Sequence, residues 1–311
     1  MVRDASKKAA ADNTWHATPE AEARAKKLRI VALVLWAVSI AIEIGGIFGL
    51  LLNKNILEAS TSVTDRGEVI ADESFPTWAF ATLIGLLVVM AILTVIGSQL
   101  WKKAQELDPP SSANGVSFFF KSQLGAIVPL IAFVPIIVLI FLNKDMSKQQ
   151  KGWAGGVGIV LALVAVALGV NYDPPSVEKY TAEKMAVVQL LGEDKVYWAG
   201  GGEVYHVCGN VSDLSKSAVT SGTTAEAVAD GKPRLTLKLE SELNACGRAV
   251  PNNIDAIVDA IRQVQQGETT EQILPSPDWT GVEGAPSGKA LDELQDVIDQ
   301  VKDEEPAGSS S

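Results

Sequence analysis

The chain has 311 residues, of which 47% are hydrophobic, and it carries a formal net charge of -11. The charge is uneven, because residues 1–172 hold 15 basic and 13 acidic side chains whereas residues 173–311 hold 11 and 24. This division excludes a single soluble globule and a disordered chain, and the absence of a basic half argues against binding to nucleic acid. We therefore expect an integral membrane protein with an acidic soluble tail.

Four apolar segments in the first half are long enough to cross a bilayer. A helix rises 1.5 Å per residue, so roughly 20 apolar residues cover about 30 Å of hydrocarbon. The sequence predicts an N-terminal arm over 1–29 and a transmembrane domain over 30–172. The predicted spans are 30–52, 78–100, 124–142 and 153–170.

Basic residues that flank the spans predict the orientation. Four of them, Arg24 to Arg29, directly precede the first span, and Lys102 and Lys103 open the second connecting loop. The first loop is acidic, whereas the third loop opposes the pattern with Lys144, Lys148 and Lys151. We expect a cytoplasmic N-terminus and, because four spans return the chain to the same side, a cytoplasmic tail. If one of the weaker spans did not cross the membrane, the tail would lie outside instead.

Glu43 is the one ionisable residue inside the first predicted span. A charge near the bilayer centre costs about 2.5–3.5 kcal/mol on the insertion scale, so this side chain should face a partner or be protonated. One hypothesis is a relay for protons or substrate. The alternative, which we favour because a relay usually needs several such groups in series, is a neutral carboxyl bonded to a neighbouring helix.

Small residues and prolines also interrupt the spans. Gly45, Gly46 and Gly49 follow Glu43, and Gly152 and Gly156 form a small-xxx-small pair at the start of the fourth span. Such pairs let helix backbones approach closely, within one chain or between subunits. Two prolines in the third span, at 129 and 135, remove backbone donors and should bend that helix.

Periodicity in the tail predicts a small α+β domain over residues 173–265. Apolar residues at helical spacing after Pro174 and Pro175 indicate a helix that ends at Gly192. Segments 195–198 and 203–208, joined by glycines, are typical of a β-hairpin. The other expected elements are a helix over 223–229, a strand over 235–240 and an amphipathic helix over 254–264.

Beyond this domain we expect a linker over 266–287, which is rich in proline, glycine and acids. Residues 288–311 should form an amphipathic helix followed by a disordered end. The predicted fold class is therefore a membrane all-α bundle of four transmembrane helices, followed by a small α+β soluble domain and a terminal amphipathic helix.

His206, Cys208 and Cys246 are the candidates for chemistry in the tail. Structural zinc normally takes four Cys or His ligands, and these are three. A disulfide between the cysteines would require an oxidising compartment, and thiol catalysis would require a third group that positions the histidine. We expect ordinary core or edge residues here, with a metal site or a disulfide as alternatives, and no catalytic residue, bound metal or cofactor.

Residues 195–235 resemble a small module found at the ends of many bacterial proteins. The matching features are a hairpin with Tyr205-His206, a Leu-Ser stretch, a helix with Glu226-Ala227 and a Gly231-Lys232 turn. In the common form of the module a CxxC pair follows the turn and, together with the histidine, suggests a zinc site. Here Leu235 and Lys238 occupy those positions, so the resemblance implies the module without its metal half.

The whole chain resembles four-span membrane proteins of Actinobacteria, a kind that includes accessory subunits of the respiratory cytochrome bc–cytochrome oxidase supercomplex. The resemblance implies a non-catalytic accessory or assembly subunit whose partners are the lipid bilayer and other membrane subunits. The haems and copper would then belong to those subunits. Two other classes remain open, a small transporter or proton-conducting protein that uses Glu43, and a membrane-anchored binding module.

Overall fold

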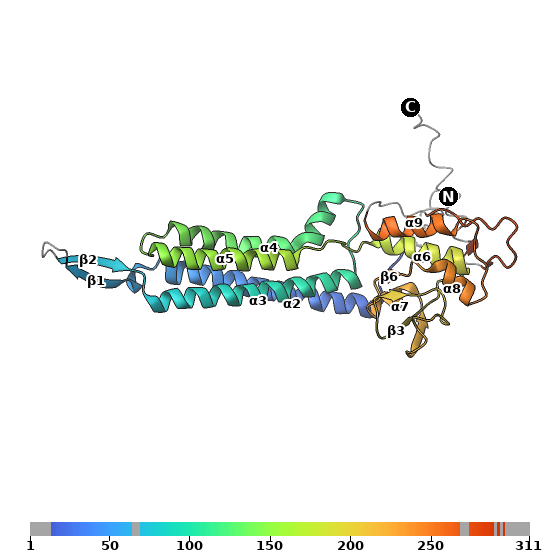
Figure 1. The fold of residues 1–311 in the computed structure, drawn as a ribbon, viewed down its shortest axis with the longest axis horizontal. Helices are drawn as coiled ribbons and strands as arrows, with labels where there is room; N and C mark the ends of the chain where they lie inside the picture. The colour runs from blue at the N-terminus through green and yellow to red at the C-terminus, as the bar shows by residue number, and fades with distance from the viewer. Residues whose placement is uncertain (1–13, 64–68, 268–273, 289–290, 293–294, 296–311) are drawn as a thin grey trace, which may run out of the picture. The chain divides into compact units, whose positions relative to one another are not determined.

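The computed structural model describes residues 14–63, 69–267, 274–288, 291, 292 and 295, and the side chains of 59–74 lie outside this description. The chain divides into two compact units (Figure 1). The membrane unit comprises Lys26–Ala104 and Phe119–Tyr172. The tail unit comprises the arm up to Ala25, the segment Gln105–Phe118 and the chain from Asp173 onward.

Four long apolar helices form the membrane unit, as predicted. Helix α2 begins in the arm, and α4 starts earlier than its predicted span because the Phe118–Phe120 run is helical. The capping box of Ser147 and Gln150 sets the start of α5. The helices are α2 (Pro19–Gly46, continued by a π-helical turn over Ile47–Leu51), α3 (Thr77–Leu107), α4 (Gly115–Leu142) and α5 (Lys148–Gly169).

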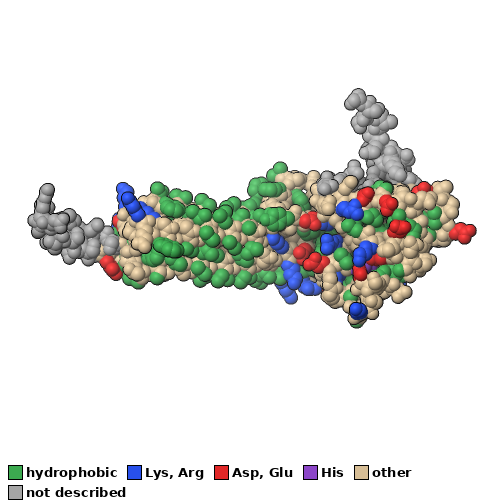
Figure 2. All heavy atoms as spheres, viewed as in Figure 1, with side chains coloured by type: hydrophobic (Ala, Val, Ile, Leu, Met, Phe, Trp, Pro, Cys, Tyr) green, Lys and Arg blue, Asp and Glu red, His purple; other side chains and the backbone are tan. Residues whose placement is uncertain are grey.

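Most of the apolar surface of these helices faces outward. Only 28 to 44% of the most apolar stretch of each helix is buried inside the chain. Figure 2 shows hydrophobic side chains along the outside of the bundle, with Lys and Arg gathered towards its ends. An exposed apolar surface of this extent is stable only against lipid or other proteins. The chain is therefore a multi-pass membrane protein with four transmembrane helices.

Helices α4 and α5 meet in backbone contact at Gly125 and Gly169. A Cβ atom added to Gly169 would overlap the carbonyl group of Gly125. Pro129 has no N–H, so the carbonyl of Gly125, four residues earlier, lacks its helical donor. The hydroxyl of Ser98 in α3 donates to this oxygen at 2.7 Å. The proline is thus tolerated because a neighbouring helix supplies the missing hydrogen bond.

The loop between α2 and α3 contains a hairpin that the sequence did not predict. Strands β1 (Glu58–Val63) and β2 (Val69–Ser74) pair antiparallel, after a short 3-10 turn over Lys54–Ile56. The base of this loop is tied to the turn between α4 and α5. Lys54 pairs with Asp145 at 2.9 Å, and the N–H of Phe75 donates to the Asp145 carbonyl at 3.0 Å.

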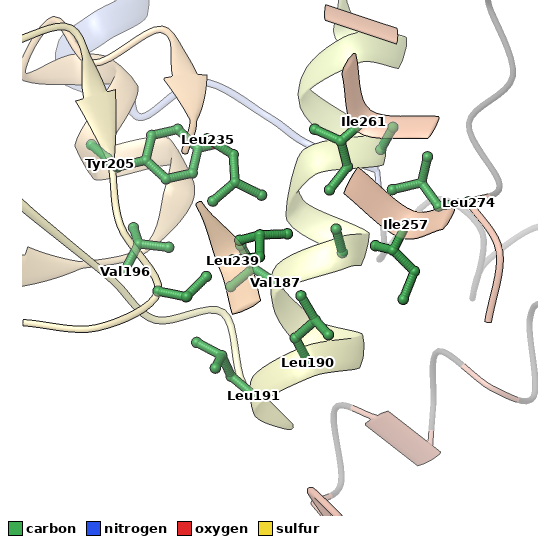
Figure 3. Close-up of a cluster of buried hydrophobic side chains, with 14 of the residues drawn as sticks. Val187, Leu190, Leu191, Val196, Tyr205, Leu235, Leu239, Ile257, Ile261 and Leu274 are labelled. Atoms are coloured by element: carbon green, nitrogen blue, oxygen red, sulfur yellow. The ribbon is translucent and has the colours of Figure 1, made fainter. Parts of the chain in front are cut away.

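The tail unit contains the predicted helices α6 (Val177–Leu191), α7 (Thr224–Ala229) and α9 (Ile254–Gln265). Helix α6 begins at the Ser176 cap and ends at Gly192, whose φ of 80° is the left-handed conformation that glycine tolerates. Figure 3 shows α9 packed against α6, with Ile257 and Ile261 facing the same core as Val187. The small mixed α/β character of this region agrees with the predicted fold class.

The strands of the tail pair differently from the prediction. The expected hairpin exists as a single bridge between Tyr197 and His206. Strand β3 (Val196–Ala199) pairs instead with β5 (Val219–Gly222), and β4 (Val204–Tyr205) pairs in parallel with β6 (Arg234–Leu235). These partners are distant in the sequence, so the local pattern could not identify them.

The predicted strand over 235–240 is wrong beyond Leu235. The hydroxyl of Thr236 accepts the N–H of Lys238, which turns the chain into helix α8 (Leu239–Ala245). Leu239 and Leu243, four residues apart on this helix, are both fully buried. The alternation of Leu235, Leu237 and Leu239 therefore spans the end of a strand and the start of a helix.

The segment predicted as a linker lies against the domain where the structure describes it. Leu274 is buried in the core, and the side chain of Asn253 donates to the carbonyl of Ser276 at 2.9 Å and accepts the N–H of Asp278 at 2.7 Å. Of the predicted terminal helix, residues 291, 292 and 295 are helical, and its other residues lie outside the described part of the chain.

The N-terminal arm contributes to the same core. Trp15 is 2% exposed, its backbone N–H donates to the Thr181 hydroxyl at 3.0 Å, and its ring lies 4.7 Å from that of Tyr180. The arm and the tail, at opposite ends of the sequence, therefore fold together.

Candidate functional site

The two cysteines of the chain form a disulfide bond between Cys208 and Cys246. Cys208 follows β4 and is fully buried, whereas Cys246 caps the end of α8 and is exposed. Their Cα atoms are 6.0 Å apart, although 38 positions separate them in the sequence. The disulfide, which the sequence left as an alternative, fastens α8 to the segment that follows β4.

His206 lies beside this disulfide and is paired with a buried glutamate. Its Nδ1 atom is 2.7 Å from Oε1 of Glu242, and both side chains are 4% exposed. The other carboxylate oxygen of Glu242 accepts the N–H of Val207 at 3.1 Å. Glu242 and Cys246 are four residues apart, so both act from one side of α8. A covalent bond and two hydrogen bonds thus hold this short helix.

This arrangement does not fit a zinc site. Thiolates bind zinc, and both sulfur atoms are here joined to each other. Within the described residues, no group of three or more His, Cys, Asp and Glu side chains is placed to hold a metal ion. In the region that resembles the zinc-type module, a disulfide and a His206–Glu242 pair provide the cross-links. With both sulfurs in the disulfide, neither cysteine is a free nucleophile.

The glycine turn of the module is held by a buried lysine. Lys232, from the Gly-Lys turn, is 3% exposed, and its ammonium group donates to the carbonyls of Gly200 at 3.1 Å and Gly202 at 2.7 Å. These carbonyl oxygens satisfy a buried charge that would otherwise be costly. The Gly-Lys turn, which the resemblance singled out, therefore has a structural role here.

A buried polar network around Glu183 was missed in the sequence. The carboxylate is fully buried, accepts the hydroxyl of Tyr205 at 2.6 Å and accepts the amide of Gln265 at 2.7 Å. Burial raises the pKa of Glu183 above its ordinary value, and the hydrogen bonds from Tyr205 and Gln265 oppose this change. The signal was present, because Glu183 lies four residues before Val187 on the apolar face of α6.

The same network extends to a buried lysine. Lys179 donates to the Gln265 carbonyl at 2.8 Å and pairs with Asp173 at 3.0 Å. Gln265 also donates to the carbonyl of Leu235 at 2.9 Å. These contacts join α6, α9 and β6, so the network fixes how the elements of the domain pack.

Glu43 lies inside the transmembrane bundle and belongs to the membrane unit, whereas the cysteine cluster belongs to the tail unit. Its side chain is 4% exposed and interacts with the backbone of Ile136, which follows Pro135 in α4. Its Oε1 atom has no hydrogen-bond partner within the described residues. The environment has features of both hypotheses, since the carboxyl contacts a neighbouring helix and yet keeps one oxygen unpaired.

The glycines of the spans fall into two groups. Gly155 contacts the ring of Phe141 and Gly158 contacts Ile137, so these positions pack within the bundle. At other positions a Cβ would meet no described atom within 4 Å outside the adjacent backbone of its own helix. These open positions include Gly85 on α3 and two pairs, Gly45 with Gly49 on α2 and Gly152 with Gly156 on α5. Each pair has the i, i+4 spacing that puts both residues on one face.

The site residues therefore form three separate groups, the Cys208–Cys246 and His206–Glu242 cluster, the Glu183 network and Glu43. No protein-family model, no curated protein and no solved structure matches the chain.

Proposed function

We propose that the protein is a non-catalytic accessory or assembly subunit of a larger membrane complex. The observation that carries this proposal is the pair of open small-residue faces, Gly45–Gly49 on α2 and Gly152–Gly156 on α5. Small residues at this spacing let a second helix approach closely, and none of the helices that the structure describes occupies these faces. The proposed partners are transmembrane helices of other subunits.

The proposed complex is the respiratory cytochrome bc–cytochrome oxidase supercomplex. Support for this choice is the resemblance of the chain, in its four spans and its tail module, to actinobacterial membrane proteins. In such an assembly the haems and copper would reside in the partner subunits. The folded tail unit would then contribute contacts outside the bilayer.

Two observations bear on orientation and oppose each other. The basic residues before the first span and in the second loop support a cytoplasmic N-terminus and a cytoplasmic tail. The Cys208–Cys246 disulfide supports the other side, because the cytoplasm keeps thiols reduced.

Affinity purification in a gentle detergent tests the proposed function. The wild-type chain should retain membrane subunits in a stoichiometric ratio, together with the haem absorption of a respiratory complex. Replacing both Gly152 and Gly156 by leucine should reduce this recovery at least tenfold, because the larger side chains keep a partner helix at a distance. Leu168→Ile, at an exposed position on a different face of the same helix, should have no effect. Recovery of a wild-type monomer alone would overturn the proposal.

A second candidate function is proton conduction, and the unpaired Oε1 atom of the buried Glu43 favours it. A carboxyl that keeps a free oxygen inside a membrane bundle can exchange a proton. Purified protein in liposomes that contain a pH-sensitive dye should then dissipate a proton gradient. Glu43→Gln should abolish that flux, whereas Ser39→Ala, at a buried position on the same helix, should retain it. Equal flux in protein-free liposomes would exclude this candidate.

A further inference from the structure

We infer that the tail unit lies on the extracytoplasmic side of the membrane, and that the N-terminal arm lies there with it. The inference rests on the disulfide bond and on the folding of the arm with the tail. It adds to the proposed function the side on which the folded unit would meet its partners. It reverses the orientation expected from the flanking charges.

The disulfide bond indicates the compartment in which the tail unit lies. The chain has two cysteines, and both are used in this one bond. Cys208 is enclosed in the domain, so the bond belongs to the folded core rather than to a flexible surface loop. Such bonds form and persist in oxidising compartments and are rare in a cytoplasm that keeps thiols reduced. A domain that contains this bond therefore belongs outside the cytoplasm.

The contacts of the tail extend this assignment to the arm and the second loop. Trp15 of the arm bonds to Thr181 of α6. From the second loop, the Pro110 carbonyl accepts the N–H of Val177 at 3.3 Å. Glu178 accepts the N–H of Ser112 at 2.7 Å. The three segments fold as one unit, so they share one side of the membrane, which agrees with an even number of spans.

The opposing charge signal is small. Within the short flanks of the spans, seven basic residues lie on the side of the tail and five on the other side. The five include Lys144, Lys148 and Lys151, the three that already opposed the expected orientation. Long domains are translocated largely regardless of their charge, so the acidic tail adds nothing to this count. A difference of two charges does not outweigh a core disulfide.

Thiol labelling of intact cells tests the inference in the full-length protein. A new cysteine would be introduced either in the tail, by Ser217→Cys, or in the opposite loop, by Asn55→Cys, with the native pair retained. Both positions are exposed. A membrane-impermeant maleimide should label the Ser217→Cys variant before lysis, and should label the Asn55→Cys variant only after lysis. The reverse result would overturn the inference.

A second measurement checks the disulfide in the same cells. Free thiols are blocked by a permeant maleimide, the protein is denatured and reduced, and newly exposed thiols are labelled with a high-mass maleimide. Two added masses in the wild-type protein are expected, because both cysteines were bonded. Cysteines that react in the first step would overturn the inference, since the bond would then be absent in the cell. Neither readout depends on a partner, so failure of the accessory-subunit proposal would leave both results interpretable.

Discussion

Removing the disulfide should destabilise the tail unit by about 4 kcal/mol. Cys246→Ala is the suitable change, because Cys246 is exposed and its loss removes little packing, while the remaining Cys208 acts as a small buried apolar residue. The bond closes a loop over a sequence separation of 38 residues. The entropy that such a cross-link removes from the unfolded chain corresponds to about 4 kcal/mol at 25 °C.

Urea unfolding followed by brief proteolysis measures this change in the full-length protein in mild detergent. The free energy of unfolding of such a domain falls by about 2 kcal/mol per molar urea, so the midpoint for cleavage of the tail should fall by roughly 2 M in the variant. Wild-type protein treated with a reductant should unfold at the same midpoint as the variant. The variant itself should not respond to the reductant.

Equal midpoints for oxidised and reduced wild-type protein would refute this reasoning. Residual contacts in the unfolded chain would then already restrict the segment between Cys208 and Cys246, so that the cross-link removes little additional entropy. The contacts of α8 that survive reduction are the His206–Glu242 pair and the buried Leu239 and Leu243. A variant that loses its fold completely, while reduced wild-type protein keeps it, would instead show that the side chain at 246 matters beyond the bond.

Three further predictions concern single side chains. Burial raises the pKa of Glu183 above its ordinary value of 4.5, so the unfolded chain releases this proton at a lower pH than the folded chain does. The free energy of unfolding of the tail should therefore fall as the pH rises above 4.5. Urea midpoints of the Glu183→Gln variant should not show this decline. Tyr205→Phe removes the hydroxyl that donates to Glu183, and the free energy of unfolding of the tail should drop by about 2 kcal/mol in urea titrations. In the bundle, Gly169→Ala should lower the melting temperature in detergent because the methyl group overlaps Gly125, whereas Gly156→Ala, at an open position, should leave it unchanged.

The membrane helices could be predicted because their signal is local. A run of about 20 apolar residues fixes a span whatever its neighbours are, and the helices α6 and α9 carry their own periodicity and terminators. The starts of α4 and α5 depend on capping and flanking residues rather than on hydropathy, so the predicted spans were shorter there. The β1–β2 hairpin lacks an alternating apolar pattern, and nothing in its sequence indicated pairing.

The candidate site was harder to predict because its geometry comes from distant contacts. Whether Cys208 meets Cys246 depends on where α8 lies, and the sequence placed a strand over the residues that begin this helix. The pairing of β4 with β6 likewise joins segments about 30 residues apart. Residue types identified His206 and the two cysteines as candidates. Only the fold shows that Glu242, four residues before Cys246, lies beside His206.

Glu43 and Glu183 show why a sequence pattern alone does not assign a role to a buried acid. Each is a carboxylate on a helix face that packs against apolar residues, and each is almost completely enclosed. Glu183 accepts two strong hydrogen bonds and stabilises one arrangement of α6, α9 and β4. Glu43 retains an oxygen without a partner in the described chain. A buried carboxylate whose oxygens all accept hydrogen bonds favours a structural role. A buried carboxylate with an unpaired oxygen can still bind a proton or accept a hydrogen bond from another subunit. Of the two buried acids, Glu43 is therefore the one whose role the liposome assay can decide, whereas the contacts of Glu183 account for its burial in the tail.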